Sequence, residues 1–176
     1  GYAEADPSAD VDGFDAASKT AILASIGFSS RVTTDDVYQQ GIRTITAEDI
    51  SVAHDLGYTI KLLGIARNTA EGVDVRVHPT MIPLDHQLAK VSGAMNAVYV
   101  VGDAVGETMF YGAGAGSFPT ASAVVGDILT LSEQISRGVA PLPESEPFSR
   151  NKPIRPMDEL ETKYYIRLRV ADRVGA

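Results

Sequence analysis

The sequence contains no cysteine among its 176 residues, so disulfide bonds, thiolate nucleophiles and cysteine metal ligands are excluded. Its three histidines, His54, His78 and His86, lie too far apart in the chain to form a short metal-binding motif. No apolar run approaches the roughly 18 to 20 residues that a bilayer-crossing helix needs. The acidic N-terminal stretch also lacks the basic region with which a signal peptide begins. These absences predict a cytoplasmic protein with no metal site and no membrane partner.

Basic residues are fewer than acidic residues. The chain has 15 lysines and arginines and 23 aspartates and glutamates, which give a net charge of -8. Since phosphate backbones bind basic surfaces, this balance argues against a nucleic-acid partner. Hydrophobic residues make up 44% and charged residues 22%, which is ordinary for a folded chain with one sizeable core. The chain starts at Gly1 rather than methionine and stops directly after a strand-like run, so we interpret it as a piece of a longer protein.

Local signals predict two helices in the first third of the chain. Gly13 or the aspartate before it can cap a helix over residues 12–28, in which apolar residues recur at helical spacing. Residues 34–41 predict one short helical turn. Thr46 then caps a second helix, with acids in its first turn and Gly57 as the left-handed residue that ends it.

Alternating apolar residues predict four strands, over residues 59–66, 73–78, 96–101 and 107–111. The first two form a hairpin. In its second strand Val73, Val75 and Val77 alternate with polar residues, which predicts one buried face and one solvent-exposed face. The long amphipathic stretch over residues 118–137 predicts a further helix that ends at Gly138.

These elements predict an α/β (α+β) fold with a mostly antiparallel mixed sheet built from the four strands. The helices over residues 12–28 and 118–137 should cover one face of this sheet. The other face would then be apolar and uncovered, and we expect a second copy of the chain to bury it in a sheet-mediated homodimer.

The composition changes after this domain, which we assign to residues 1–138. Five prolines among serines and glutamates predict a linker over residues 139–160. Residues 163–170 alternate strongly and predict a strand, so residues 161–176 are interpreted as the start of another, truncated domain.

Asp15 and Lys19 are spaced to share one face of the first helix at i, i+4, with the acid on the favourable N-terminal side. One interpretation is a solvated surface pair that contributes about 0.3 to 0.5 kcal/mol. The other is a lysine held by a carboxylate and placed to exchange a proton with a substrate oxygen. The acids before this pair would then hold a cationic group of the substrate.

A glycine-rich run over residues 112–116 precedes the long helix. Its glycines could permit tight packing, or they could let the backbone approach a ligand at a helix start, where negative charge is favoured. The run is not the GxGxxG motif of a dinucleotide-binding fold, because the strand–loop–helix order and the acidic ribose partner are missing. We interpret the histidines and methionines as structural residues.

Several segments resemble, in order, those of the homoserine dehydrogenase family. The resemblance covers about residues 1–138 and begins with a signature that continues to Lys19. Its segments are GYAEADP at 1–7, DGFDAA at 12–17, LGY at 56–58, KLLG at 61–64, VHP at 77–79, GAMNAV at 93–98 and the glycine run. The resemblance implies an NAD- or NADP-dependent enzyme that interconverts L-homoserine and L-aspartate 4-semialdehyde on the route to threonine, methionine and isoleucine. It also implies a mixed sheet backed by helices, a homodimer, and an N-terminal domain, missing from this chain, that binds most of the cofactor.

By motif position, the resemblance implies a role for each candidate site residue. Lys19 matches the proton-transfer lysine and Asp15 the acid beside it. Glu4 matches the residue that holds the amino group of the substrate, with Asp10 as a helper and Tyr2 nearby. The cofactor would be touched from this side by Gly116 and by its neighbours Gly114 and Ala115.

Residues 164–176 resemble the first strand and turn of an ACT regulatory domain, which implies that the parent enzyme senses an amino acid. Two alternatives stay open. The parent could be a non-catalytic dimerisation or regulatory module, or a dehydrogenase of another small amino acid. The residues that contact the ribose and distinguish NAD from NADP are missing from the chain. Because the chain also lacks most of the cofactor site, we expect the isolated fragment to be inactive.

Overall fold

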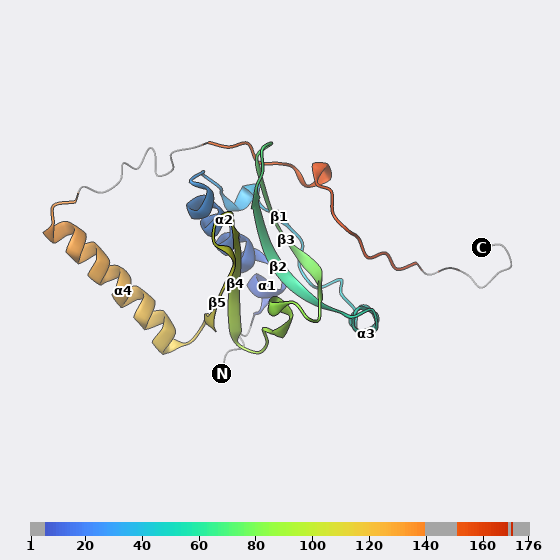
Figure 1. Cartoon of the computed structure of the whole chain (residues 1–176). Coiled ribbons are helices and arrows are strands. Elements are labelled where there is room, and N and C mark those ends of the chain that lie inside the picture. Colours follow the sequence, from blue (N-terminus) through green and yellow to red (C-terminus); the bar gives the residue numbers. More distant parts are fainter. Residues whose placement is uncertain (1–5, 140–150, 169, 171–176) are drawn as a thin grey trace.

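The computed structural model describes residues 6–139, 151–168 and 170, and it contains two small sheets accompanied by helices (Figure 1). A helix long and apolar enough to cross a membrane is not found among these residues. The elements in chain order are α1 (Ser8–Val11), α2 (Phe14–Phe28), the 3-10 turn η1 (Thr34–Asp36), β1 (Tyr38–Gln39), α3 (Ala47–Asp55), β2 (Tyr58–Asn68), β3 (Val73–Pro83), the 3-10 turn η2 (Gln87–Lys90), β4 (Met95–Gly102), β5 (Gly106–Ala113), α4 (Ser117–Ser136) and the 3-10 turn η3 (Met157–Glu159).

A three-stranded sheet in the order β1-β3-β2 forms the centre of the domain. Strands β2 and β3 are antiparallel along their whole length, whereas the short β1 runs parallel to β3. The hairpin predicted from the sequence is therefore confirmed. The helical turn predicted over residues 34–41 is correct only for η1, because β1 follows it and pairs with β3.

Helix α2 covers one face of this sheet. Small side chains let the helix lie close to the strands, and a Cβ added to Gly64 of β2 would stand only 1.9 Å from Thr20 Oγ1 of α2. The buried core joins three alanines of the helix to three valines of β3, namely Ala17, Ala21, Ala24, Val73, Val75 and Val77. The side of α2 that carries Asp15 and Lys19 is consequently turned toward solvent.

Strands β4 and β5 form a separate antiparallel sheet. The predicted α/β class with mostly antiparallel strands is confirmed, but the prediction of one four-stranded sheet is wrong. Alternation predicts that a strand exists without saying which neighbour it pairs with. Val98, Val100 and Phe110 lie on the same side of this hairpin and are 37%, 42% and 69% exposed. These three residues are called the hairpin patch below.

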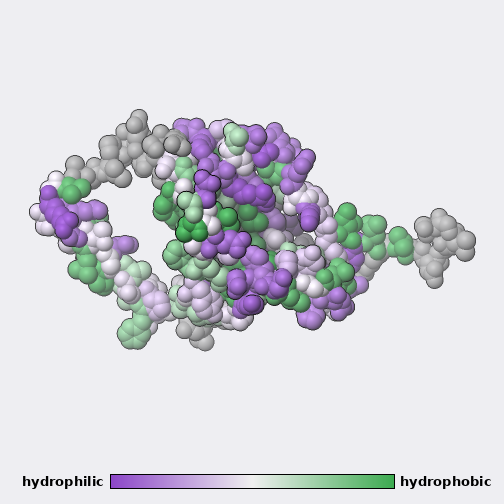
Figure 2. All heavy atoms as spheres, in the orientation of Figure 1, coloured by the Kyte–Doolittle hydropathy of each residue, from purple (hydrophilic) through white to green (hydrophobic). Residues whose placement is uncertain are grey.

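Helix α4 does not cover a sheet, contrary to the prediction. None of its residues is buried, and it lies apart from both sheets in Figure 1. Its apolar side chains, such as Phe118 and Ile135, are exposed, and Figure 2 shows hydrophobic residues along the helix. An amphipathic pattern indicates that one face of a helix seeks an apolar partner, but it does not identify that partner.

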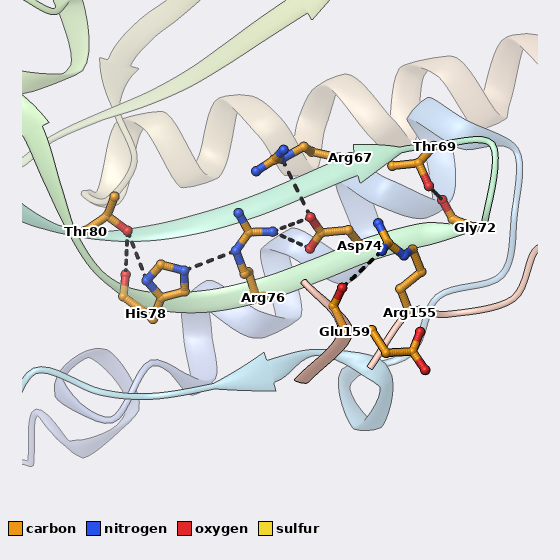
Figure 3. A network of polar contacts seen from close by, with 9 residues as sticks. All are labelled: Arg67, Thr69, Gly72, Asp74, Arg76, His78, Thr80, Arg155 and Glu159. Carbon is orange, nitrogen blue, oxygen red and sulfur yellow. Dashed lines mark hydrogen bonds and ion pairs between the residues drawn. The ribbon is translucent and has the colours of Figure 1, made fainter. Parts of the chain in front are cut away.

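Both faces of β3 are buried over residues 73–77, which corrects the prediction that its polar residues face solvent. Asp74 and Arg76 are each 3% exposed and form an ion pair with each other (Figure 3). Arg76 Nε also donates to His78 Nε2 at 3.1 Å, and Arg67 Nε lies 3.6 Å from Asp74 Oδ2. Alternation predicts which residues share a face, but a charged face can be buried when its charges satisfy one another.

Residues 151–155, part of the predicted linker, lie along the edge of β3. Val73 N donates to Pro153 O, and Arg155 N donates to Val73 O, each at 2.8 Å. A Cβ added to Gly72 would stand 2.3 Å from Pro153 O, so the turn between β2 and β3 and this segment fit closely. This part of the linker is therefore bound to the sheet.

The strand predicted over residues 163–170 is not observed in the described part of that range, which adopts no regular secondary structure. A strand needs a hydrogen-bonded neighbour, and alternation alone does not supply one. The segment instead contacts the start of α3, where Arg167 Nη1 lies 2.6 Å from Glu48 Oε2 and Arg167 Nε lies 3.3 Å from Asp49 Oδ1.

Candidate active site

The Asp15–Lys19 pair lies at the start of α2 and has the predicted geometry. Gly13 caps the helix at φ 86°, a left-handed conformation that glycine adopts without strain and that turns the chain sharply from α1 into α2. Lys19 Nζ donates a hydrogen bond to Asp15 Oδ2 one turn earlier. The two side chains are 63% and 44% exposed, so the lysine is held by a carboxylate yet open to a ligand.

Residues 6–12 precede α2, contain α1 and include three aspartates; they are called the acidic turn below. Ser8 donates to Asp6 Oδ1 through both its backbone N–H, at 3.0 Å, and its hydroxyl, at 2.5 Å. These two donors, the hydroxyl first, hold the pKa of the Asp6 carboxyl below its usual value. Asp10 lies in the first turn of α1 and is exposed. The turn therefore presents carboxylates to solvent, and it directly precedes in the chain the helix that carries Asp15 and Lys19.

Arg43 forms a fork with Asp12 at the end of this acidic turn. Its Nε donates to Asp12 Oδ1 at 2.5 Å and its Nη2 to Asp12 Oδ2 at 3.0 Å. The same Nη2 lies 3.3 Å from Ser8 Oγ. The hydrogen bond from Arg43 lowers the pKa of the Asp12 carboxyl, and the same bond raises the pKa of the guanidinium.

The glycine loop joins β5 to α4. A Cβ added to Gly114 would stand 2.1 Å from Asn96 Nδ2, so the loop backbone packs directly on a β4 side chain. Gly116 precedes α4 at φ 122°, a conformation that residues with a Cβ rarely adopt. Ala115 between them is exposed. The packing interpretation therefore holds at Gly114, and the loop still leaves backbone open at the start of a long helix.

Among the predicted site residues, the structure brings Asp15 and Lys19 into direct contact. Asp10, Asp15 and Lys19 lie on two consecutive helices joined through a short turn at Gly13. Tyr2 and Glu4 fall outside the described residues. Within the described ranges, no hydrogen bond or ion pair links the glycine loop to this group, so their convergence on one cleft stays a prediction. The same ranges contain no cluster of three or more His, Asp or Glu side chains that could hold a metal ion.

Comparison with known proteins identifies the family. The family model described as homoserine dehydrogenase matches residues 1–129. The chain is 52% identical over 180 residues to the homoserine dehydrogenase of Mycobacterium tuberculosis, covering 99% of this chain and 40% of that protein. The chain belongs to the homoserine dehydrogenase family.

Solved structures agree with this family at the level of the fold. The homoserine dehydrogenase of Thiobacillus denitrificans superposes with a TM-score of 0.84 and 48% identity, over 90% of this chain and 38% of that one. A hyperthermophilic archaeal homoserine dehydrogenase mutant, solved in complex with NADPH, gives a TM-score of 0.57 at 27% identity, over 74% of this chain and 36% of that one. The present chain therefore spans about two fifths of the length of these relatives.

Arg43 and Gln39 were not predicted from the sequence. Gln39 Nε2 donates to Asp12 O at 2.8 Å, across 27 positions of the sequence. Such a contact carries no local signal, because it depends on β1 pairing with β3 and bringing residues 39–43 beside the acidic turn. Asn96 beneath Gly114 was likewise missed, although it lies in a segment that matches the family.

Proposed function

We propose that the full-length protein is an NAD- or NADP-dependent homoserine dehydrogenase and that this chain supplies its catalytic and substrate-binding part. The observation that carries the proposal is the hydrogen-bonded Asp15–Lys19 pair at the start of α2. The pair adjoins an acidic turn, as a substrate with an ammonium group requires. Family membership supports this proposal over a plain surface ion pair, and the exposure of both side chains leaves them accessible to a substrate.

Lys19 acts as the general acid or base of the reaction. In the oxidative direction its amine accepts the proton of the C4 hydroxyl of L-homoserine while a hydride leaves C4, which yields L-aspartate 4-semialdehyde. In the reverse direction its ammonium donates a proton to the aldehyde oxygen as the hydride arrives. Asp15 holds Nζ in place through its hydrogen bond. A nicotinamide dinucleotide, when bound, would accept or supply the hydride.

The carboxylates of the acidic turn bind the other end of the substrate. We assign the α-ammonium group to Glu4 and Asp10, with Tyr2 beside them, because carboxylates are the natural partners of an ammonium group. Asp10 is exposed and lies one short turn before α2, which supports this role. The ammonium group is charged in both substrate and product, so this contact persists through the reaction and contributes to binding more than to turnover.

The glycine loop makes only a limited contact with the cofactor. Gly116, with Gly114 and Ala115 beside it, leaves backbone exposed at the start of the 20-residue helix α4, where N–H groups favour a negatively charged ligand. These residues fit one edge of a dinucleotide, and we assign the rest of its binding to the part of the protein outside this chain. The NADPH complex of the archaeal relative supports a nicotinamide dinucleotide as the cofactor.

The test is a turnover assay on the full-length protein. With NAD or NADP in excess, L-homoserine should drive formation of the reduced dinucleotide, whereas L-serine, L-threonine and D-homoserine should give rates lower by at least about 10²-fold, because the site must hold both ends of one substrate. This chain alone should give no turnover. A preference for one of the other amino acids would favour a different dehydrogenase, and no turnover with any of them would favour a non-catalytic module.

We further propose a homodimer built through the hairpin patch, in the cytoplasm. Exposed apolar residues on one side of a two-stranded sheet support a second copy as the partner, since the patch can pair with itself about a twofold axis. Sedimentation of the full-length protein at micromolar concentration should give a dimer, and Val100→Lys should shift it toward monomer, whereas Val101→Lys, on the other side of the strand, should not. A strict monomer for the unaltered protein would contradict this proposal.

We also propose that residues 1–138 form the catalytic domain, that 161–176 begin an ACT-like regulatory domain, and that 139–160 connect the two. The contacts of Arg167 with Glu48 and Asp49 support a physical link between this tail and α3. Titrating the full-length protein with the amino acids that the pathway produces, threonine first, measures whether this regulatory domain binds an amino acid.

A further inference from the structure

The acidic turn has little packing of its own. Helix α1 is only four residues long and contains no buried residue. A helix this short is unstable by itself, because too few hydrogen bonds offset the cost of nucleating it. Something outside the turn must therefore fix the positions of its carboxylates relative to Asp15 and Lys19.

Residues 39–43, called the strap here, supply that support from the sheet. Gln40 N donates to Val77 O of β3 at 2.8 Å, which continues the pairing of β1 and anchors the strap. Ile42 N donates to Val11 O at 2.9 Å. A Cβ added to Gly41 would stand 2.4 Å from that same Val11 oxygen, so the two backbones are in direct contact.

Two side chains of the strap complete the attachment, and both reach Asp12. The Gln39 amide donates a hydrogen bond to the backbone carbonyl of Asp12, and the Arg43 guanidinium donates two hydrogen bonds to the Asp12 carboxylate. Arg43 also reaches Ser8, whose hydroxyl in turn donates to Asp6. The Arg43 guanidinium is thus bonded at both ends of the turn that contains Asp10.

We propose that Arg43 is a positioning residue, which locks the acidic turn so that its remaining carboxylates receive the substrate ammonium group. This inference rests on the proposed function. Arg43 acts through Asp12 and Ser8 and does not itself contact substrate. Its charge also neutralises Asp12, so the fork removes that carboxylate from competition for the ammonium group and leaves Asp10 and its neighbours to bind it.

The test compares Arg43→Met with unaltered full-length protein. We expect KM for L-homoserine to rise about threefold to tenfold, with kcat and the KM for the dinucleotide changed less than about twofold, because a displaced turn weakens a contact made throughout the reaction. Arg43→Lys, which keeps the charge but not the fork, should recover part of the loss. Asp12→Asn should produce the same rise, and combining it with Arg43→Met should add nothing further if both act through one contact.

Arg137→Met is the matched control, since it removes an exposed arginine whose partner, Glu133, lies 2.6 Å away on α4. It should leave both kinetic constants unchanged. Amide hydrogen exchange provides a readout that does not depend on activity, and Arg43→Met should speed exchange at residues 10–12 while the core strands keep their protection. Unchanged amide exchange at residues 10–12 in Arg43→Met, or an active Arg43→Met enzyme with an unchanged KM for L-homoserine, would overturn the inference. Faster exchange in a protein that never oxidises L-homoserine would support the positioning contact and reject only the proposed function.

Discussion

Replacing Lys19 by alanine in the full-length protein should lower kcat for L-homoserine oxidation by about 10²- to 10⁴-fold, the usual effect of removing a positioned acid–base group. The KM for homoserine should change much less, because in the proposed mechanism Lys19 contacts the reacting oxygen whereas the acidic turn holds the ammonium group. The fold should be unaffected, since the Lys19 side chain is 63% exposed and its pair with Asp15 is a surface pair. Steady-state kinetics and a melting curve on the same preparation measure both effects.

Two variants show whether this loss is specific. Lys163→Ala removes another exposed lysine, distant in sequence from α2, and should leave kcat unchanged. Asp15→Asn should lower kcat less than Lys19→Ala, because it removes the partner that holds Nζ but leaves the amine itself. An enzyme with Lys19→Ala and nearly normal kcat would refute the proposed proton transfer, even though the family assignment would stand.

Replacing Arg76 by methionine should destabilise the chain by about 3 to 5 kcal/mol, because it leaves the buried carboxylate of Asp74 without its main partner. Both side chains of this pair are 4% exposed, so water cannot compensate for the lost ion pair. Arg67 lies 3.6 Å from the same carboxylate and is itself 56% exposed, so it can replace the lost contact only in part. The free energy of unfolding from chemical denaturation provides the measurement.

The double variant Asp74→Val with Arg76→Met removes both charges and should recover most of the lost stability, since an apolar pair needs no compensation for buried charge. Arg137→Met breaks the exposed pair with Glu133 and should change stability by less than about 0.5 kcal/mol. A loss below about 1 kcal/mol for Arg76→Met would mean that the buried face of β3 is open to solvent or can rearrange.

Elements specified by neighbouring residues were predicted well from the sequence. Helix α3 begins where Thr46 Oγ1 accepts from Asp49 N at 3.2 Å and Asp49 Oδ2 accepts from Thr46 N at 2.9 Å, a cap formed entirely within four consecutive residues. The β2–β3 hairpin and the Asp15–Lys19 pair are similarly local. Their geometry is set by strand alternation and helical spacing, so no distant contact was needed to predict them.

Features that depend on distant partners could not be predicted in this way. The pattern of α4 shows an apolar face but not what it packs against, and β4 with β5 could have joined the other sheet by the same alternation. The Arg43–Asp12 fork joins residues 31 positions apart and depends on how β1 pairs. The roles assigned to Glu4, Asp10 and the glycine loop came from family resemblance, because spacing alone left a surface ion pair and a packing loop as open alternatives.

The most direct test of the proposed reaction is to identify the product that the full-length protein makes from L-homoserine. With NAD or NADP present and the aldehyde trapped as it forms, we expect L-aspartate 4-semialdehyde in a one-to-one ratio with reduced dinucleotide. We further expect both the product and the reduced dinucleotide to disappear in Lys19→Ala on the same time scale. Reduced dinucleotide formed without this aldehyde, or no homoserine-dependent reduction by a folded full-length protein, would contradict the central claim.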